Sequence, residues 1–253
     1  MNIALFAARN VGYEIAKFFG ENQEPLACLV LDSRDASGLN LRIIRDSAIP
    51  QNRIFFSDAI NQRETLQNLR ELSLDLILLA WWPYIIKESL IQIPRLGCLN
   101  FHPSYLPYNR GKHYNFWSII EDTPFGVTLH FVNKGIDTGD IAYQSLIEKS
   151  WEDSGETLYV KAQKEMVRLF KEKFSEIKNG QIPRRPQDLS KGYFHTASEL
   201  DPASEIILEK TYKARELLNL IRARTFKPHP GAWFVDQGIK YEVRIEITRQ
   251  DSP

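Results

Sequence analysis

Short apolar runs that alternate with helical patterns constrain the fold of this chain more than any other feature. Uninterrupted apolar runs are typical of strands buried on both faces of a parallel sheet. Five such runs cover residues 1–8, 25–31, 54–56, 74–80 and 97–102. Apolar residues recur at helical spacing between them, around residues 11–19, 64–72 and 87–91. This alternation predicts an α/β fold with a doubly wound, mostly parallel (Rossmann-like) sheet.

The pattern changes after residue 125. Two strand-like segments and a long helix, capped by Ser154, cover residues 125–132, 141–149 and 156–178. Prolines then mark a linker, and a helix at 211–224 and a hairpin at 232–235 and 240–247 follow. We therefore predict a main domain at residues 1–182, a linker at 183–202, and a small C-terminal helix plus β-hairpin appendage at 203–253.

Charge balance and cysteine content narrow the classes of protein to which the chain can belong. Its 32 basic and 32 acidic side chains cancel, whereas proteins that grip long nucleic acids usually carry a basic excess. Cys28 and Cys98 are the only cysteines, and their apolar surroundings favour buried thiols over disulfides or a metal cluster. The chain lacks a signal-type start and any apolar run near the roughly 20 residues that span a bilayer. We expect a cytoplasmic globular protein without metal, nucleic acid or membrane as a partner.

Asn100 and His102 form the most informative polar pair. They lie two residues apart at the end of an apolar run, so both side chains point to the same face of the predicted strand. Ligands of open α/β sheets bind beyond the carboxyl ends of the strands. A lone Asn-X-His pattern is nevertheless more often structural than catalytic, so the pair alone does not identify a site.

Asp137 supplies a second signal. It lies between two glycines in the loop that joins two strand-like segments, and glycines permit a tight loop that can aim a carboxylate. Alone, this loop would be an ordinary turn. Together, the Asn-X-His-Pro-Ser strand end and the Asp-X-Gly loop resemble the folate-dependent formyltransferase family, whose members share an Asn, a His and an Asp in this order. The resemblance covers roughly residues 1–180 and implies that the catalytic residues are Asn100, His102 and Asp137.

The resemblance also implies N10-formyltetrahydrofolate as the formyl donor and a primary amine as the acceptor. An oxyanion develops when the amine attacks the formyl carbon, and the NH2 of Asn100 can donate to it. His102 can accept the amine's proton or donate to the oxyanion, while Asp137 can hold the imidazole, raise its basicity or relay protons. In relatives, the segment after the fourth strand lines the pterin pocket, although we expect at least one of its two tryptophans to be core. The residues implied in donor binding are Trp81, Trp82, Pro83, Tyr84, Ile85 and Asp140.

The loop at residues 106–117 indicates which amine is formylated. In tRNA-specific relatives this loop usually carries a small residue and a proline, where this chain has His113, Tyr114 and Asn115. It resembles the loop of sugar N-formyltransferases, which act on 3- or 4-amino-dideoxy sugars linked to dTDP, or on perosamine linked to GDP, for surface polysaccharides such as the O-antigen. Arg9 and Asn10, predicted as a short turn before the first helix, are candidates for the diphosphate. The acceptor residues implied in full are Arg9, Asn10, Pro103, Ser104, Tyr108, Asn109, Arg110, Gly111, His113, Tyr114 and Asn115.

The C-terminal part agrees with this acceptor. Residues 203–253 are too few for the basic barrel that follows in methionyl-tRNA formyltransferase, which weighs against tRNA. A lone two-stranded ribbon is marginal in water, so we expect the hairpin to pair with a second subunit in a homodimer.

Several alternatives stay open at this point. One is formylation of another amine, such as methionyl-tRNA or glycinamide ribonucleotide, and another is hydrolysis of formyltetrahydrofolate. A third is a catalytically dead folate- or nucleotide-sugar-binding module. The nucleotide base and the position of the sugar amine are not fixed by the sequence.

Overall fold

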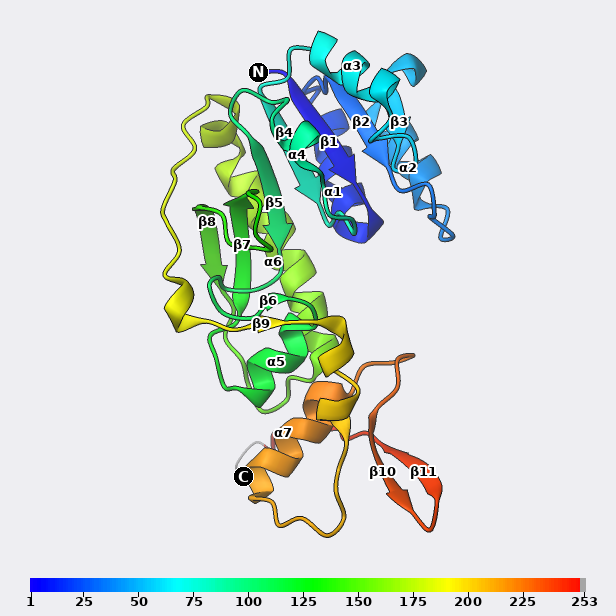
Figure 1. Cartoon of the computed structure of the whole chain (residues 1–253), viewed down its shortest axis with the longest axis vertical. Helices are drawn as coiled ribbons and strands as arrows, with labels where there is room; N and C mark the ends of the chain where they lie inside the picture. Colours follow the sequence, from blue (N-terminus) through cyan, green and yellow to red (C-terminus); the bar gives the residue numbers. More distant parts are fainter. Residues whose placement is uncertain (251–253) are drawn as a thin grey trace. The chain divides into compact units, whose positions relative to one another are not determined.

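The computed structural model describes residues 1–250. Its main sheet has seven strands in the order β3-β2-β1-β4-β5-β7-β8. These strands are β1 (Ile3–Ala7), β2 (Cys28–Leu31), β3 (Ile54–Phe56), β4 (Leu76–Ala80), β5 (Cys98–His102), β7 (Gly126–Phe131) and β8 (Ile141–Leu146). The first five pair in parallel, and β7 runs antiparallel to β5 (Figure 1). The expected doubly wound, mostly parallel sheet is confirmed.

Seven α-helices and four short strands outside the main sheet complete the fold of residues 1–250. The helices are α1 (Arg9–Glu21), α2 (Leu39–Ser47), α3 (Arg63–Glu71), α4 (Glu88–Ile91), α5 (Tyr114–Ile120), α6 (Gly155–Lys178) and α7 (Ala214–Arg224). The short strands are β6 (Arg110–Gly111), β9 (Phe194–His195), β10 (Ala232–Asp236) and β11 (Ile239–Val243). Short 3-10 turns cover Gln51–Arg53, Leu189–Lys191, Ala197–Glu199 and Pro202–Ser204. Within the described residues, none of the helices is both long and apolar enough to cross a lipid bilayer.

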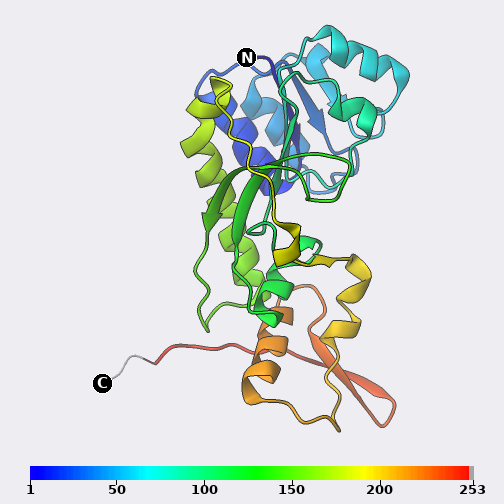
Figure 2. The ribbon, with the colours of Figure 1, turned by 60° about the vertical axis from the view of Figure 1, so that its left-hand side comes forward.

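Helices cover both faces of the parallel strands, which explains why β1, β2, β3 and β4 are apolar at every position. On one face, alternate strand residues such as Phe6, Val30 and Leu79 pack with side chains of α3 and α4. On the other face, α1 packs on α6, and the ring centroids of Phe18 and Phe174 lie 4.9 Å apart (Figure 2). A strand buried from both sides gains nothing from polar residues, so the 1–8 and 74–80 runs contain few.

The described residues form two compact units, each discontinuous along the chain. The sheet unit contains Met1–His102, Thr128–Gln144 and Gln163–Gln187. The loop unit contains Pro103–Val127, Ser145–Ala162 and the chain from Asp188 onward. The domain boundaries at 182 and 202 that we inferred from the sequence stay a prediction.

Some elements differ from the expectation. Arg9 and Asn10, predicted as a turn, form the first turn of α1, because Ala8 is already the extended residue before the helix. α2 was not expected, and only Ile43 and Ser47 on it are buried. β6 and β9 have two residues each, which is too short for any periodicity to show.

The predicted hairpin is confirmed. β10 and β11 pair antiparallel, with Asp236 opposite Ile239. The two residues between them, Gln237 and Gly238, have φ angles of 47° and 79°. Positive φ at both positions is the geometry of the two-residue turn that matches the natural twist of a hairpin.

Candidate active site

Asn100 and His102 lie on β5, opposite the antiparallel strand β7. The register puts Asn100 across from His130 and His102 across from Thr128. The Asn100 Nδ2 atom lies 3.2 Å from His130 Nε2, and His130 Nδ1 lies 2.9 Å from the carbonyl oxygen of Phe131. Since a carbonyl can only accept, Nδ1 carries a hydrogen, and in the arrangement in which Nε2 has none, Nε2 accepts from the Asn100 amide. In that arrangement one N–H of the Asn100 amide is fixed, and the orientation of the second follows from it.

Asp137 connects two histidines in the sheet unit. Its two carboxylate oxygens lie 3.5 Å from His102 Nδ1 and 3.4 Å from His130 Nε2. The side chains of His102, His130 and Asp137 are 6%, 3% and 13% exposed. His130 Nε2 cannot accept from Asn100 and donate to Asp137 in one protonation state, so the network has two proton arrangements. Burial keeps water from weakening these contacts.

The loop between β7 and β8 holds Asp137 in a left-handed conformation, with φ of 52°. The side-chain oxygen of Asn133 accepts hydrogen bonds from the Gly135 N–H at 3.0 Å and from Thr138 Oγ1 at 2.8 Å. A Cβ atom at Gly139 would collide with the carbonyl oxygen of Phe131. The tight loop that its glycines predicted is therefore present, and its own side chains and backbone shape it.

The 106–117 loop belongs to the loop unit, where its two key amides are buried. Asn109 is 1% exposed, and its amide fits with the oxygen toward Thr123 Oγ1 at 2.8 Å and the nitrogen toward Glu121 at 3.1 Å. Asn115 is 8% exposed and donates to the Gly155 carbonyl at 2.7 Å. Both amides hold the shape of the loop, so a direct contact with an acceptor stays a prediction for them.

The other predicted acceptor residues differ in exposure. Arg9 and Asn10 are exposed at the start of α1, whereas Pro103 and Ser104 are buried. Those that are partly exposed are Tyr108, Arg110, Gly111, His113 and Tyr114. The Arg110 guanidinium donates to the Gly192 carbonyl at 3.3 Å, where β6 pairs with β9.

His113 precedes α5 with φ of 59°. Burial lowers the pKa of its imidazole, and the nearby basic side chains of Arg224, Lys112 and His229 lower it further. A neutral imidazole can both donate and accept a hydrogen bond, which suits a neutral hydroxyl of a ligand.

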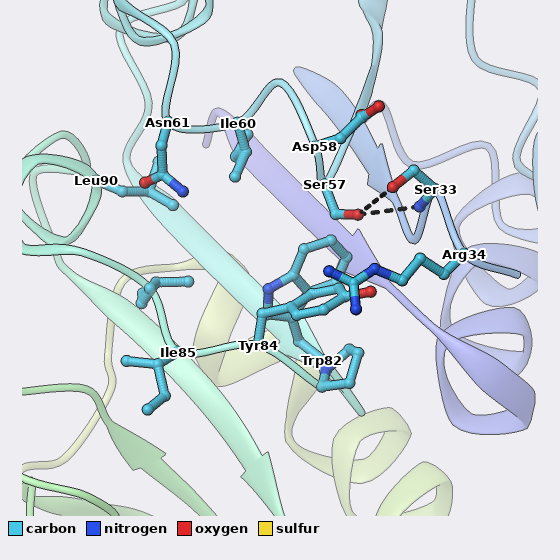
Figure 3. Close-up of a pocket in the computed structure, with 12 residues that line it drawn as sticks. Ser33, Arg34, Ser57, Asp58, Ile60, Asn61, Trp82, Tyr84, Ile85 and Leu90 are labelled. Carbon is cyan, nitrogen blue, oxygen red and sulfur yellow. Dashed lines mark hydrogen bonds between the residues drawn. The ribbon is translucent and has the colours of Figure 1, made fainter.

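Four of the six predicted donor residues line a pocket of about 400 Å³ in the sheet unit (Figure 3). These four are Trp82, Pro83, Tyr84 and Ile85. The Tyr84 hydroxyl donates to Asp32 at 2.6 Å, and the Arg34 guanidinium lies 5.4 Å from the centre of the Tyr84 ring. The volume falls within the range of small-molecule sites.

Trp81 and Asp140 do not line this pocket. Trp81 is buried at the end of β4, as expected for a core tryptophan. Its φ angle is 59°. The Asp140 backbone oxygen accepts from the Phe131 N–H at 2.8 Å, beside the Asp137 loop. Their roles in donor binding stay predictions.

His130 is the residue of this site that the sequence reasoning missed. It lies inside an apolar strand, where a histidine is usually structural, and 30 residues separate it from Asn100. Its position opposite Asn100 follows only from the antiparallel register of β5 and β7. No cluster of three or more His, Cys, Asp or Glu side chains that could hold a metal occurs within residues 1–250.

Solved structures of similar fold include enzymes with different acceptors. A sugar N-formyltransferase from a Shewanella species is 18% identical, with 99% of each chain covered and a TM-score of 0.82. An N-formyltransferase from Helicobacter canadensis, in complex with folinic acid and dTDP-3-aminofucose, is 18% identical over 94% of this chain and 85% of that one, with a TM-score of 0.71. Methionyl-tRNA formyltransferase from Clostridium thermocellum is 17% identical over 98% of this chain and 94% of that one, with a TM-score of 0.65. This last match covers nearly all of both chains, so the two chains are of similar length. The shortness of this chain is therefore no argument against a tRNA acceptor.

The family of the chain follows from its sequence. Residues 199–249 match an N-formyltransferase dimerization C-terminal domain. Residues 3–173 match the formyl transferase family, and this stretch contains the β5 strand end and the Asp137 loop. Since that match covers more than half of the 253 residues, the chain belongs to the formyl transferase family.

Proposed function

We propose that this protein moves a formyl group from N10-formyltetrahydrofolate to the amine of a nucleotide-linked amino-dideoxy sugar. Asn100, His102 and Asp137 are its catalytic residues in this proposal. The observation that carries it is the buried network of one amide, two imidazoles and one carboxylate, in which Asp137 reaches both histidines. Such a group can donate to an oxyanion and move a proton without rearranging its neighbours.

The chemistry assigns one task to each side chain. The amine nitrogen attacks the formyl carbon and a new C–N bond forms, while the carbonyl oxygen becomes an oxyanion that accepts from the Asn100 NH2. The bond from that carbon to N10 of the donor then breaks, N10 takes up a proton, and the amine loses one. His102 takes the proton of the amine, and Asp137 orients the imidazole and stabilises its charged form. His130 orients the Asn100 amide.

The donor binds against the segment that follows β4. Support comes from the pocket lined by Trp82, Tyr84 and Ile85, whose flat and apolar side chains suit a bicyclic ring. The H. canadensis enzyme of the same fold binds folinic acid, a formylated folate, which also favours this donor. Asp140 contributes in this proposal from the loop beside Asp137.

The acceptor is a dTDP-linked 3- or 4-amino sugar. Two solved enzymes of the same fold support a sugar acceptor, one being a sugar N-formyltransferase and one binding dTDP-3-aminofucose. The Shewanella and H. canadensis enzymes also have higher TM-scores with this chain than methionyl-tRNA formyltransferase has. The product would serve synthesis of a surface polysaccharide such as the O-antigen.

The protein acts as a homodimer in this proposal. The match of residues 199–249 to a dimerization domain supports it, as do the half-exposed apolar side chains of the hairpin, among them Val235, Ile239 and Tyr241.

Acceptor screening tests the proposal directly. Purified protein is incubated with N10-formyltetrahydrofolate and a panel of dTDP- and GDP-linked amino sugars, and products are sought by the added mass of a formyl group. We expect a formylated product from at least one dTDP-linked 3- or 4-amino sugar. Turnover of charged initiator tRNA with no sugar product would overturn the acceptor, and release of formate without any acceptor would indicate hydrolysis instead.

A further inference from the structure

Gln187 contacts the Asp137 loop from outside it. Its side-chain nitrogen donates to the backbone carbonyl of Asp137 at 3.0 Å and to that of Gly139 at 2.6 Å. All three residues belong to the sheet unit. The two acceptors flank the turn that aims the Asp137 carboxylate, so a single amide fixes both sides of this turn.

The segment that carries Gln187 is held in place before it reaches the loop. Figure 1 shows the chain leaving α6 and running along the outer side of the edge strand β8. Arg185 and Ile141 exchange two backbone hydrogen bonds, of 2.8 Å and 3.0 Å, as an isolated bridge. The Arg184 guanidinium donates to the Leu96 carbonyl at 2.7 Å and lies over the Phe131 ring. Gln187 therefore projects from an anchored backbone.

Gln187 adds to the hydrogen bonds that the loop makes for itself. Asn133 bonds to the Gly135 N–H and to Thr138 Oγ1, and neither bond involves the carbonyls of Asp137 and Gly139. Asp137 is in the left-handed region, which costs a non-glycine residue of the order of 1 kcal/mol or more unless its surroundings hold it there. Donation from Gln187 to these two carbonyls stabilises that conformation.

We propose that Gln187 is a positioning residue for the reaction, acting on Asp137 through the backbone of its loop. The proposal rests on the proposed function, since it takes Asp137 to be catalytic. A displacement of about 1 Å in a catalytic group can lower a rate by about 100-fold. Both side-chain hydrogen bonds that Gln187 makes within residues 1–250 go to this loop, so we expect its loss to affect the chemical step more than acceptor binding.

Two variants and a matched control test this role. Gln187→Ala removes the donor, and Gln187→Glu keeps the shape but turns a carboxylate oxygen toward two carbonyl oxygens. Gln181→Glu is the control, because Gln181 is exposed on the same segment and its substitution adds the same charge as Gln187→Glu. We expect kcat to fall by at least about 10-fold in both Gln187 variants while KM for the amino sugar changes less than about threefold. Gln181→Glu should match the wild type in both constants.

A measurement without turnover separates this proposal from the proposed function. The chain has five histidines, so the imidazole ¹⁵N signals of labelled protein can be assigned with His102→Gln and His130→Gln variants. We expect Gln187→Ala to shift the ¹⁵N signals of His102 or His130, because the Asp137 carboxylate between them moves, and Gln181→Glu to leave them unchanged. Unchanged signals and a kcat within twofold of wild type would overturn the positioning role. A rise in KM of the same factor as the fall in kcat, together with a lower melting temperature, would also overturn it. That outcome would indicate a general folding role. If no amine is formylated by the wild type, the proposed function fails, and the ¹⁵N signals alone decide whether Gln187 positions Asp137.

Discussion

The reaction centre of the sheet unit and the 106–117 loop of the loop unit use buried polar side chains in opposite ways. In the reaction centre, the side chains of Asn100, His102, His130 and Asp137 contact one another. In the loop, the Asn115 amide bonds to a backbone carbonyl at the start of α6, and Asn109 bonds to neighbouring side chains. In the proposed function, the first arrangement performs chemistry through its side chains, whereas the second fixes the shape of a backbone.

The two regions should therefore respond differently to substitutions. A group of mutually bonded catalytic residues loses its function when any member is removed, and the losses are not additive. A loop held by its amides loses shape, so stability and acceptor affinity change together while the chemical step is spared.

Removal of the proposed catalytic residues should give the largest effect. We expect Asn100→Ala, His102→Ala and Asp137→Ala each to lower kcat by about 100-fold to 10,000-fold. The double variant His102→Ala/Asp137→Ala should lose little more than the worse single variant, because the two residues act as a unit. Single-turnover rates measure this, with thermal unfolding as the check on folding. Rates close to wild type in all three single variants would remove the mechanism.

Two arginines on α7 form a matched pair that tests how buried polar side chains stabilise the loop unit. Arg222 and Arg224 are each 9% exposed. Arg222 donates to the carbonyls of Ser150 and Asp153 at 2.9 Å and 2.7 Å and to Asn219 Oδ1 at 2.9 Å. Arg222→Met removes all three bonds and takes the donor from the carbonyl of Asp153, the one acceptor residue of the three that is buried, so the free energy of unfolding should fall by about 1–3 kcal/mol.

Arg224 has no hydrogen-bond acceptor or ion-pair partner within residues 1–250, although Asp201 and Glu242 favour its charge from a distance. Arg224→Met removes a buried cation without breaking a bond, so we expect a change of at most about 1 kcal/mol, or a gain. Urea unfolding of both variants gives the comparison. Equal losses would show that burial alone, and not hydrogen bonding, decides how these residues stabilise the unit.

Asn115→Ala tests whether the loop acts through its shape. The variant loses the bond to the Gly155 carbonyl, so we expect a loss of about 1–3 kcal/mol in stability. KM for the amino sugar should rise while kcat stays near wild type, because no group of the reaction centre is touched. Asn52→Ala, at an exposed position, is the control and should change stability by less than about 0.5 kcal/mol. A loss of kcat with unchanged KM would assign Asn115 to the chemical step and erase the contrast between the two regions.

The sequence predicted the parallel sheet from local pattern, and it indicated the proposed catalytic trio through two short motifs that together resemble a known family. Strands buried on both faces must be apolar at each position, and a strand end followed by a glycine-flanked Asp is a short, recognisable motif. Residues 97–102 were therefore identified both as a strand and as part of a site.

His130 and Gln187 could not be predicted in the same way. His130 meets Asn100 only because β7 runs antiparallel to β5 in one register, and Gln187 reaches the Asp137 loop only after a long helix and an edge bridge. Neither lies in a motif. The burial of Asn109 and Asn115 was also missed, since a polar residue in a loop is usually exposed and only tertiary packing reverses this.

The smallest expected effect is a dependence of stability on pH through His113. Burial, with Arg224 next in importance, lowers the pKa of His113 below its usual value of 6.5. Well above pH 6.5 the imidazole is neutral in both the folded and the unfolded chain and does not change the stability. As the pH falls below 6.5, the unfolded chain takes up a proton that folded His113 resists, so stability is lost until the lowered pKa of the folded state is passed. His113→Gln should therefore gain stability relative to wild type between pH 7.5 and pH 5.5, by a fraction of about 1 kcal/mol. Urea unfolding at these two pH values measures the difference, in which other titrating groups cancel.

In an Arg224→Met background the gain should shrink, because one cation that opposes protonation is gone. A stability difference between wild type and His113→Gln that does not change with pH would show that folded His113 titrates as it does in the unfolded chain.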